Sequence, residues 1–118
     1  MRFDVAAEVT ANTRLSPDYN VIAVHAPEIA RAAEPGQFVM IKPRPGRDPR
    51  LRRPCSIFER LHDAAGEPAG LTILNKRVGA GTSILFAVKP GEVISVLGPL
   101  GRPFTPVEQP AEAWMVAG

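Results

Sequence analysis

The tetrapeptide Arg53-Pro54-Cys55-Ser56 places a cation, a rigid backbone position, a thiol and a hydroxyl at the start of an apolar run. The Arg53 guanidinium can donate two parallel, charge-assisted hydrogen bonds to a diphosphate. Pro54 stiffens the backbone and has no N–H to donate, and the Ser56 hydroxyl can donate or accept a hydrogen bond. The segment could therefore bind an anion. The same four residues are also compatible with a plain structural role, as a surface arginine, a strand-initiating proline and an edge serine.

A second candidate binding segment, Gly79-Ala80-Gly81-Thr82, precedes an expected helix. Glycines let the backbone approach a ligand closely, and free N–H groups at a helix start attract phosphate. The alternative is an ordinary glycine-rich turn capped by Thr82. A third segment, Gly98-Pro99-Leu100-Gly101, directly follows an expected strand, and its residue types alone predict a tight turn.

Cys55 is the single cysteine, which excludes an internal disulfide and a multi-cysteine metal site within this chain. A nucleophilic role lacks an adjacent base, since neither His25 nor His62 is placed near it by the sequence, so a small apolar filler is favoured. Five arginines also cluster without aromatic residues between them, which favours a solvated loop over a nucleic-acid surface. They are Arg44, Arg47, Arg50, Arg52 and Arg53.

The composition bounds the class of protein. The 118 residues are 45% hydrophobic and 22% charged, as in a soluble globular domain, and the net charge of +2 does not imply a polyanionic partner. The start MRFDVAAEVT is no signal peptide, and no apolar run approaches the roughly 20 residues that cross a bilayer. We expect a cytoplasmic protein that binds neither membrane nor nucleic acid.

Thirteen prolines predict many short elements joined by turns. Pro-Gly at 35–36 and at 90–91 suits type II turns, each leading into a strand. Period-two or apolar runs predict six strands, around residues 5–9, 21–23, 38–41, 56–61, 71–76 and 93–97. One short helix follows Gly81, with Thr82 or Ser83 as its N-cap, and residues 29–33 predict a weaker helical turn. The fold class is therefore all-β, a six-stranded antiparallel barrel with one short helix.

The last residues do not fit this barrel. Residues 112–117 resemble the first buried strand of a dinucleotide-binding unit, which commonly ends in glycine, as here at Gly118. We expect a barrel domain over residues 1–110, followed at 111–118 by the first strand of a truncated nucleotide-binding domain.

The order of these motifs is more specific than any one of them. Arg53 with Ser56 three places on, a strand ending at 74–76, the glycine turn at 79–82 and the turn at 98–101 follow one another. In this order they resemble the FAD-binding domain of the ferredoxin reductase superfamily. Within it, the chain most resembles the electron-transfer subunits of NAD-linked dihydroorotate dehydrogenases.

The resemblance implies a Greek-key barrel that binds FAD. Arg53 would contact the FAD diphosphate, Pro54 and Cys55 would line the flavin, and Ser56 would lie near flavin N5. Residues of the next strand would run beside the cofactor, and the helix start would present N–H groups to the diphosphate. These residues are Leu74, Asn75, Lys76, Gly81 and Thr82.

The resemblance also implies a role in pyrimidine biosynthesis. NAD(H) and a cysteine-ligated [2Fe–2S] cluster would bind in the missing C-terminal part, and a dihydroorotate dehydrogenase catalytic subunit would be the partner, in a heterotetramer. This fragment alone would be inactive, with no catalytic or metal-ligating residue of its own. Two alternatives stay open: the flavin subunit of a cytosolic hydrogenase or ferredoxin–NADP transhydrogenase, and a non-catalytic barrel that binds RNA or an acidic protein through residues 44–53.

Overall fold

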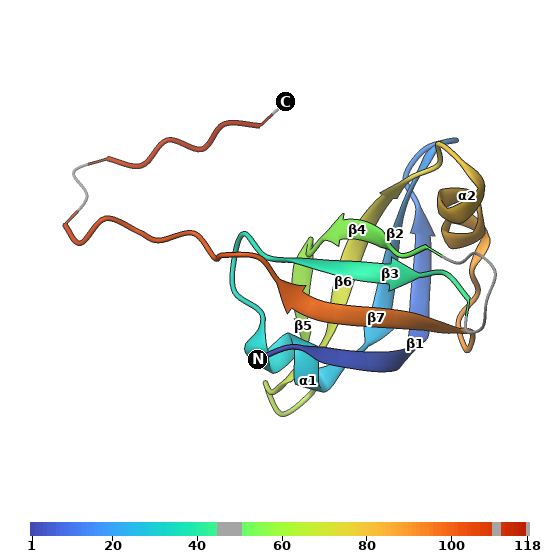
Figure 1. Cartoon of the computed structure of the whole chain (residues 1–118), viewed down its shortest axis with the longest axis horizontal. Helices are drawn as coiled ribbons and strands as arrows, with labels where there is room; N and C mark the ends of the chain where they lie inside the picture. The colour runs from blue at the N-terminus through green and yellow to red at the C-terminus, as the bar shows by residue number, and fades with distance from the viewer. Residues whose placement is uncertain (45–50, 110–111, 118) are drawn as a thin grey trace.

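The computed structural model describes residues 1–44, 51–109 and 112–117. Within them, seven antiparallel strands form one strongly curled sheet, and two short helices lie at its ends (Figure 1). The elements are β1 (Phe3–Arg14), β2 (Tyr19–His25), α1 (Pro27–Ala32), β3 (Phe38–Lys42), β4 (Arg53–Ser56), β5 (Glu59–His62), β6 (Pro68–Lys76), α2 (Ala80–Ala87) and β7 (Val93–Leu100).

The strand order is β4-β3-β7-β1-β2-β6-β5, so the two outermost strands, β4 and β5, follow each other in the chain. Residues 57–58 cross from one edge of the sheet to the other and curl it toward a barrel. Expecting a single strand over 56–61 was wrong, because β4 pairs with β3 whereas β5 pairs with β6. The all-β Greek-key fold class is confirmed, with seven strands in place of six.

Both Pro-Gly turns form as the sequence predicts. Gly36 and Gly91 adopt φ values of 95° and 94°, and each turn is closed by a hydrogen bond between its first carbonyl and the N–H three residues later. In each turn that last side chain also folds back: the Gln37 Oε1 accepts from the Glu34 N–H, and the Glu92 Oε2 accepts from the Lys89 N–H. The same local device therefore starts β3 and precedes β7.

The core fills the inside of the curled sheet. Ile22, Ile41, Ile73 and Ile94 come from four different strands and are completely buried, and burying such a side chain contributes about 1.5–3 kcal/mol. The weak helical turn expected at 29–33 is the helix α1, which packs against β6 and β7. No helix in the described part of the chain is long and apolar enough to cross a membrane.

The segment at 98–101 does not form the turn expected after a strand. β7 continues to Leu100, and a side chain at Gly98 would come within 2.7 Å of a methyl carbon of Val39. Gly98 is therefore required for the packing of β7 against β3. The described residues beyond Leu100 form no helix or strand, so a further domain starting at 111–118 stays a prediction.

Candidate functional site

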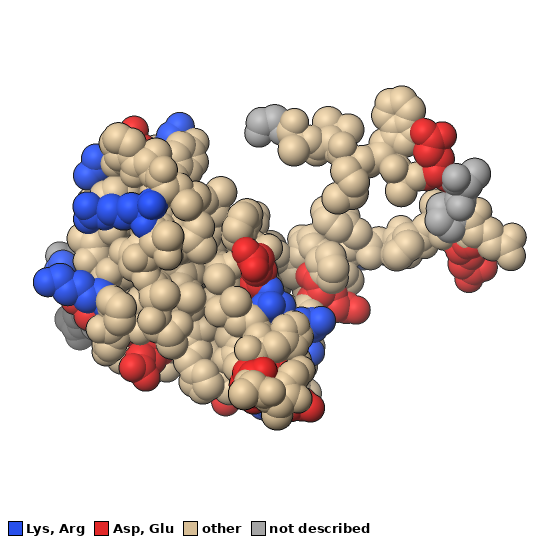
Figure 2. All heavy atoms as spheres, turned by 180° about the vertical axis from the view of Figure 1, so that it is seen from behind, with Lys and Arg blue, Asp and Glu red and all other residues tan. Residues whose placement is uncertain are grey.

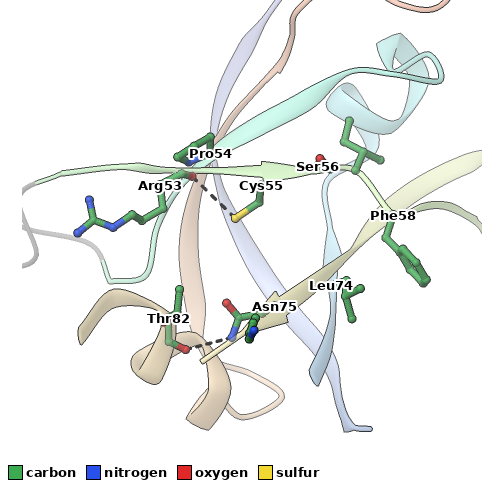
Figure 3. Close-up of a pocket in the computed structure, with 10 residues that line it drawn as sticks. Arg53, Pro54, Cys55, Ser56, Phe58, Leu74, Asn75 and Thr82 are labelled. Carbon is green, nitrogen blue, oxygen red and sulfur yellow. Dashed lines mark hydrogen bonds between the residues drawn. The ribbon is translucent and has the colours of Figure 1, made fainter. Parts of the chain in front are cut away.

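A groove of about 480 Å³ opens between β4 and the end of β6, beside the first turn of α2 (Figure 3). Eight of the nine site residues predicted from the sequence line it, and the ninth, Gly81, borders it next to Arg53. The lining residues are Arg53, Pro54, Cys55, Ser56, Ile57, Phe58, Leu74, Asn75, Lys76 and Thr82.

The groove exists because two strand edges diverge. β6 pairs with β5 only over residues 68–72, and β4 pairs only with β3. The last link across the gap is the hydrogen bond from the Phe58 N–H to the Thr72 carbonyl, at 2.9 Å. Beyond it, the free edges at 53–56 and 74–76 face each other without a strand between them, which leaves room for a ligand.

One end of the groove has the groups that an anion needs. The exposed Arg53 side chain passes the α2 start, with its Cγ and Nε 3.8 Å from where a Cβ at Gly81 would lie. The N–H groups of Ala80, Gly81 and Thr82 belong to the first helical turn and have no intrahelical carbonyl to bind. A guanidinium beside free helix-start amides is a suitable arrangement for phosphate oxygens.

Thr82 acts differently from the N-cap expected of it. The helix begins three residues earlier than predicted, with Gly79 as N-cap, and the Thr82 hydroxyl accepts hydrogen bonds from the Val78 and Gly79 N–H groups at 2.8 and 2.9 Å. Its side chain is thus used to fix the loop that leads into α2. Only its backbone N–H is left for a ligand.

The other end of the groove is apolar. Leu74 is 42% exposed and Phe58 is 53% exposed, because no described part of the protein covers these two apolar side chains. The Ser56 hydroxyl, also exposed, has no hydrogen-bond partner among the described residues. Lys76 lies at the rim, with its ammonium 5.5 Å from the centre of the Tyr19 ring. A flat apolar ligand with polar edges would fit these surroundings.

Cys55 and Asn75 form the floor between the two ends. Their side chains point toward each other from β4 and β6 in Figure 3. Burial raises the pKa of the Cys55 thiol above its ordinary value, so the group stays neutral at physiological pH. A thiolate nucleophile is not favoured here, and the thiol serves as a small, partly buried filler packed against the core.

Three asparagines on adjacent strands hold α2 in place. The Asn75 Nδ2 donates to the Asn20 Oδ1 at 2.9 Å, and the Asn20 Nδ2 donates to the Asn12 Oδ1 at 2.8 Å. Each amide also donates to carbonyls of the helix region: Asn75 to Thr82, Asn20 to Leu85, and Asn12 to Phe86 and Val88. This asparagine ladder (Asn12, Asn20, Asn75) fixes both the start and the end of α2 relative to the sheet.

The sequence did not identify four of the residues that build this region. Ile57 and Phe58 were placed within a continuous strand, although the residues that follow Ser56 leave β4 and turn into the groove wall. Asn12 and Asn20 were not singled out. A polar amide between apolar neighbours in β2, with Ile22 and Val24 following at period two, was the available signal.

The arginine cluster is only partly open to a partner. Arg52 is committed to Asp4, with 3.0 and 3.1 Å between its Nη2 and the two carboxylate oxygens. Arg47 and Arg50 lie outside the described residues. Figure 2 shows basic and acidic side chains together on the face seen from behind. Of the three described arginines of this cluster, Arg52 is therefore neutralised by a carboxylate, whereas Arg44 and Arg53 are exposed.

Comparison with known proteins gives a consistent answer. No protein-family model matches the chain. The chain is 42% identical over 99 residues to the dihydroorotate dehydrogenase B (NAD(+)) electron transfer subunit of Desulforamulus reducens, covering 84% of this chain and 36% of that relative. It is 49% identical over 84 residues to the subunit of the same name from Bacillus cereus strain G9842, covering 71% and 30%. The chain thus spans about a third of the length of these relatives.

Solved structures show the same fold. An NADH-dependent reduced ferredoxin–NADP oxidoreductase aligns with a TM-score of 0.71 and 27% identity, over 86% of this chain and 34% of that one. A ferredoxin reductase of carbazole 1,9a-dioxygenase aligns with a TM-score of 0.71 and 26% identity, over 88% and 32%. By sequence and fold together, the chain belongs to the family of dihydroorotate dehydrogenase B electron transfer subunits, of which it contains the ferredoxin reductase-like barrel.

Proposed function

We propose that this chain binds FAD in the groove between β4 and β6 and serves as the flavin domain of an electron-transfer subunit. The single observation that carries the proposal is the juxtaposition of Arg53 with the free amides of the α2 start at one end of a groove whose other end is apolar. A dinucleotide with a charged diphosphate and a flat ring system matches both ends. FAD fits this set of groups better than a free nucleotide, which would leave the apolar end unused.

Each residue then has a defined task. Arg53 and the N–H groups of Gly81 and Thr82 would bind the diphosphate. Pro54 would hold the backbone of β4, while Cys55 and Leu74 would exclude water from the ring.

Ser56 would present its hydroxyl to flavin N5, where it can donate or accept a hydrogen bond as the protonation of that nitrogen changes. Lys76 would line the rim. FAD, when bound, supplies the exchange of a hydride with a nicotinamide and of single electrons with other redox centres.

The wider function is part of the same proposal. In a full-length subunit, NAD(H) and a [2Fe–2S] cluster would bind outside this barrel, and electrons would pass between NAD(H) and a dihydroorotate dehydrogenase catalytic subunit, in a heterotetramer that serves pyrimidine biosynthesis. The names and lengths of the relatives support this assignment. A cytoplasmic location belongs to the proposal as well. RNA binding is not favoured, because Arg52 is occupied by Asp4.

A titration of the purified chain with FAD tests the cofactor assignment. We expect one FAD per chain, a rise in melting temperature with FAD concentration, and weaker binding of riboflavin, which lacks the diphosphate. The chain alone is expected not to oxidise NADH. If saturating FAD produced neither bound flavin nor a thermal shift, the proposal would be refuted.

A further inference from the structure

Among the side-chain amide atoms of the asparagine ladder, the Asn75 Oδ1 is the one without a hydrogen-bond partner among the described residues. Main-chain carbonyls can only accept hydrogen bonds, so each amide must turn its NH₂ group toward α2, and its orientation is fixed. Asn75 is held most firmly in this way, because its Nδ2 donates both to the Thr82 carbonyl at 3.0 Å and to the Asn20 Oδ1. The side chain therefore cannot present its NH₂ group to the groove.

The remaining atom of Asn75 is an acceptor without a partner. The residue is only 3% exposed, yet no described residue donates a hydrogen bond to its Oδ1. In Figure 3 this oxygen points into the groove, toward Cys55. A hydrogen bond to this oxygen contributes about 0.5–1.5 kcal/mol, so a ligand that donates to it gains affinity.

The place of this oxygen limits what the donor can be. Asn75 is bonded to Thr82, in the first turn of α2, and so lies next to the anion-binding end rather than at the exposed apolar end. An acceptor at this point repels phosphate oxygens and attracts an uncharged O–H group. The matching ligand carries a hydroxylated chain directly after its diphosphate.

We propose that Asn75 is a specificity-determining residue whose Oδ1, oriented by the asparagine ladder, accepts a hydrogen bond from a hydroxyl of the chain that links diphosphate and ring. The assignment rests on the proposed function and specifies it, since in FAD this chain is ribityl. Asn20 is a positioning residue, because it acts on the ligand only through Asn75, whereas Asn12 contacts only Asn20 and the end of α2.

Binding measurements on two variants test the assignment. Asn75→Leu keeps the approximate size of the side chain and removes the acceptor together with the two bonds that the Nδ2 donates. Because Asn20 and Asn12 still bind the carbonyls near the end of α2, we expect the helix to stay in place and FAD binding to weaken about tenfold. The affinity for ADP, which has a diphosphate but no ribityl chain, is expected to stay within about twofold. Asn12→Ala is the matched control, because it removes ladder bonds far from the groove and leaves both bonds of Asn75 intact. It is expected to lower the melting temperature without changing either affinity.

A ligand-side measurement on the unmodified chain needs no variant to fold. FAD with a deoxygenated linker chain is expected to bind about tenfold more weakly than FAD, and Asn75→Leu is expected to add no further loss. FAD methylated at ring N3 is expected to bind as FAD does.

The outcomes separate the two levels of the proposal. Weakening by the N3 methyl group alone would assign the donor to the ring and overturn the hydroxyl assignment. Equal losses for FAD and ADP in Asn75→Leu, or unchanged FAD binding, would overturn it too. Failure of the unmodified chain to bind FAD at all would instead refute the proposed function itself.

Discussion

Replacing Arg53 by alanine is the most informative perturbation of the groove. The guanidinium lies beside the α2 start, where it can donate two charge-assisted hydrogen bonds to a diphosphate. Such bonds contribute about 1.5–3 kcal/mol when well formed. Because Arg53 is exposed in the free protein and is solvated there, we take the lower part of this range, roughly 2 kcal/mol for the whole side chain. Arg53→Ala should therefore weaken FAD binding about 30-fold.

The neighbouring residue provides a control of equal charge. Arg52→Ala removes one positive charge from the same strand start, but Arg52 is bound to Asp4 and to the Met40 carbonyl and does not line the groove. We expect it to leave FAD affinity within about twofold and to lower the stability by less than about 1 kcal/mol, as for other partly exposed ion pairs. Arg53→Lys should fall between wild type and Arg53→Ala, because it keeps the charge and loses the planar fork.

Isothermal titration calorimetry at two salt concentrations is the measurement. Raising the salt should weaken binding to the wild type more than to Arg53→Ala, which has lost one of the charges that salt screens. If Arg52→Ala and Arg53→Ala weakened FAD binding equally, the attraction would be a diffuse property of the arginine cluster, and the specific diphosphate contact would be wrong.

Three further predictions concern the glycines and the thiol. Gly81→Ala should keep the fold, because its Cβ would meet neighbouring atoms only at ordinary contact distances of 3.8 Å and more. It should nevertheless weaken FAD binding, because the new methyl group narrows the end of the groove beside Arg53. Melting curves measure the effect on stability, and FAD titrations measure the effect on binding. Gly70→Ala should lower the free energy of unfolding by more than about 2 kcal/mol, because its Cβ would collide with the Val24 carbonyl. Gly79→Ala, which has open space around its Cβ, should lower the free energy of unfolding by less than about 1 kcal/mol. Equal losses for the two variants on urea denaturation would contradict this reasoning. Alkylation of Cys55 by iodoacetamide should be slow at neutral pH, should speed up with a midpoint above the ordinary thiol pKa, and should be slower still when FAD is bound. The thiol of the unfolded chain loses its proton at a lower pH than the buried thiol of the folded chain. The free energy of unfolding should therefore fall as the pH rises from the ordinary thiol pKa toward the raised pKa of the folded protein.

Local chemistry made several elements predictable. The two Pro-Gly turns required a positive φ at a known position, and they formed as expected at Gly36 and Gly91. The groove residues were predictable in a different way, through the order of motifs that marks the family. Neither alternation nor propensity would have predicted that Arg53 and Thr82 line one groove. Arg53 begins β4, Thr82 lies in α2 directly after β6, and β4 and β6 are not neighbours in the sheet.

Long-range packing explains what the sequence could not predict. After Ser56 the apolar pair Ile57-Phe58 leads directly into Glu59-Arg60-Leu61-His62, and no proline or glycine interrupts this stretch. Nothing local therefore shows that the chain leaves one sheet edge at Ile57 and joins the other. In β2 the buried face is Asn20, Ile22 and Val24, and a fully buried asparagine hides this face from a search for alternating apolar residues. Its burial is explained only by partners that lie 8, 55 and 65 positions away in the chain.

The divergence of β4 and β6 would give a cofactor bound between them a second role. Because β4 and β6 share no backbone hydrogen bonds along the groove, a flat molecule bound tightly between them would replace part of the missing packing and so help to stabilise the fold. Any ligand that binds only the native state adds about 2.7 kcal/mol of stability at a hundred times its dissociation constant. With FAD bound in the groove as proposed, the lifetime of this polypeptide in a cell would depend on riboflavin supply, and chains made during vitamin shortage should be degraded first.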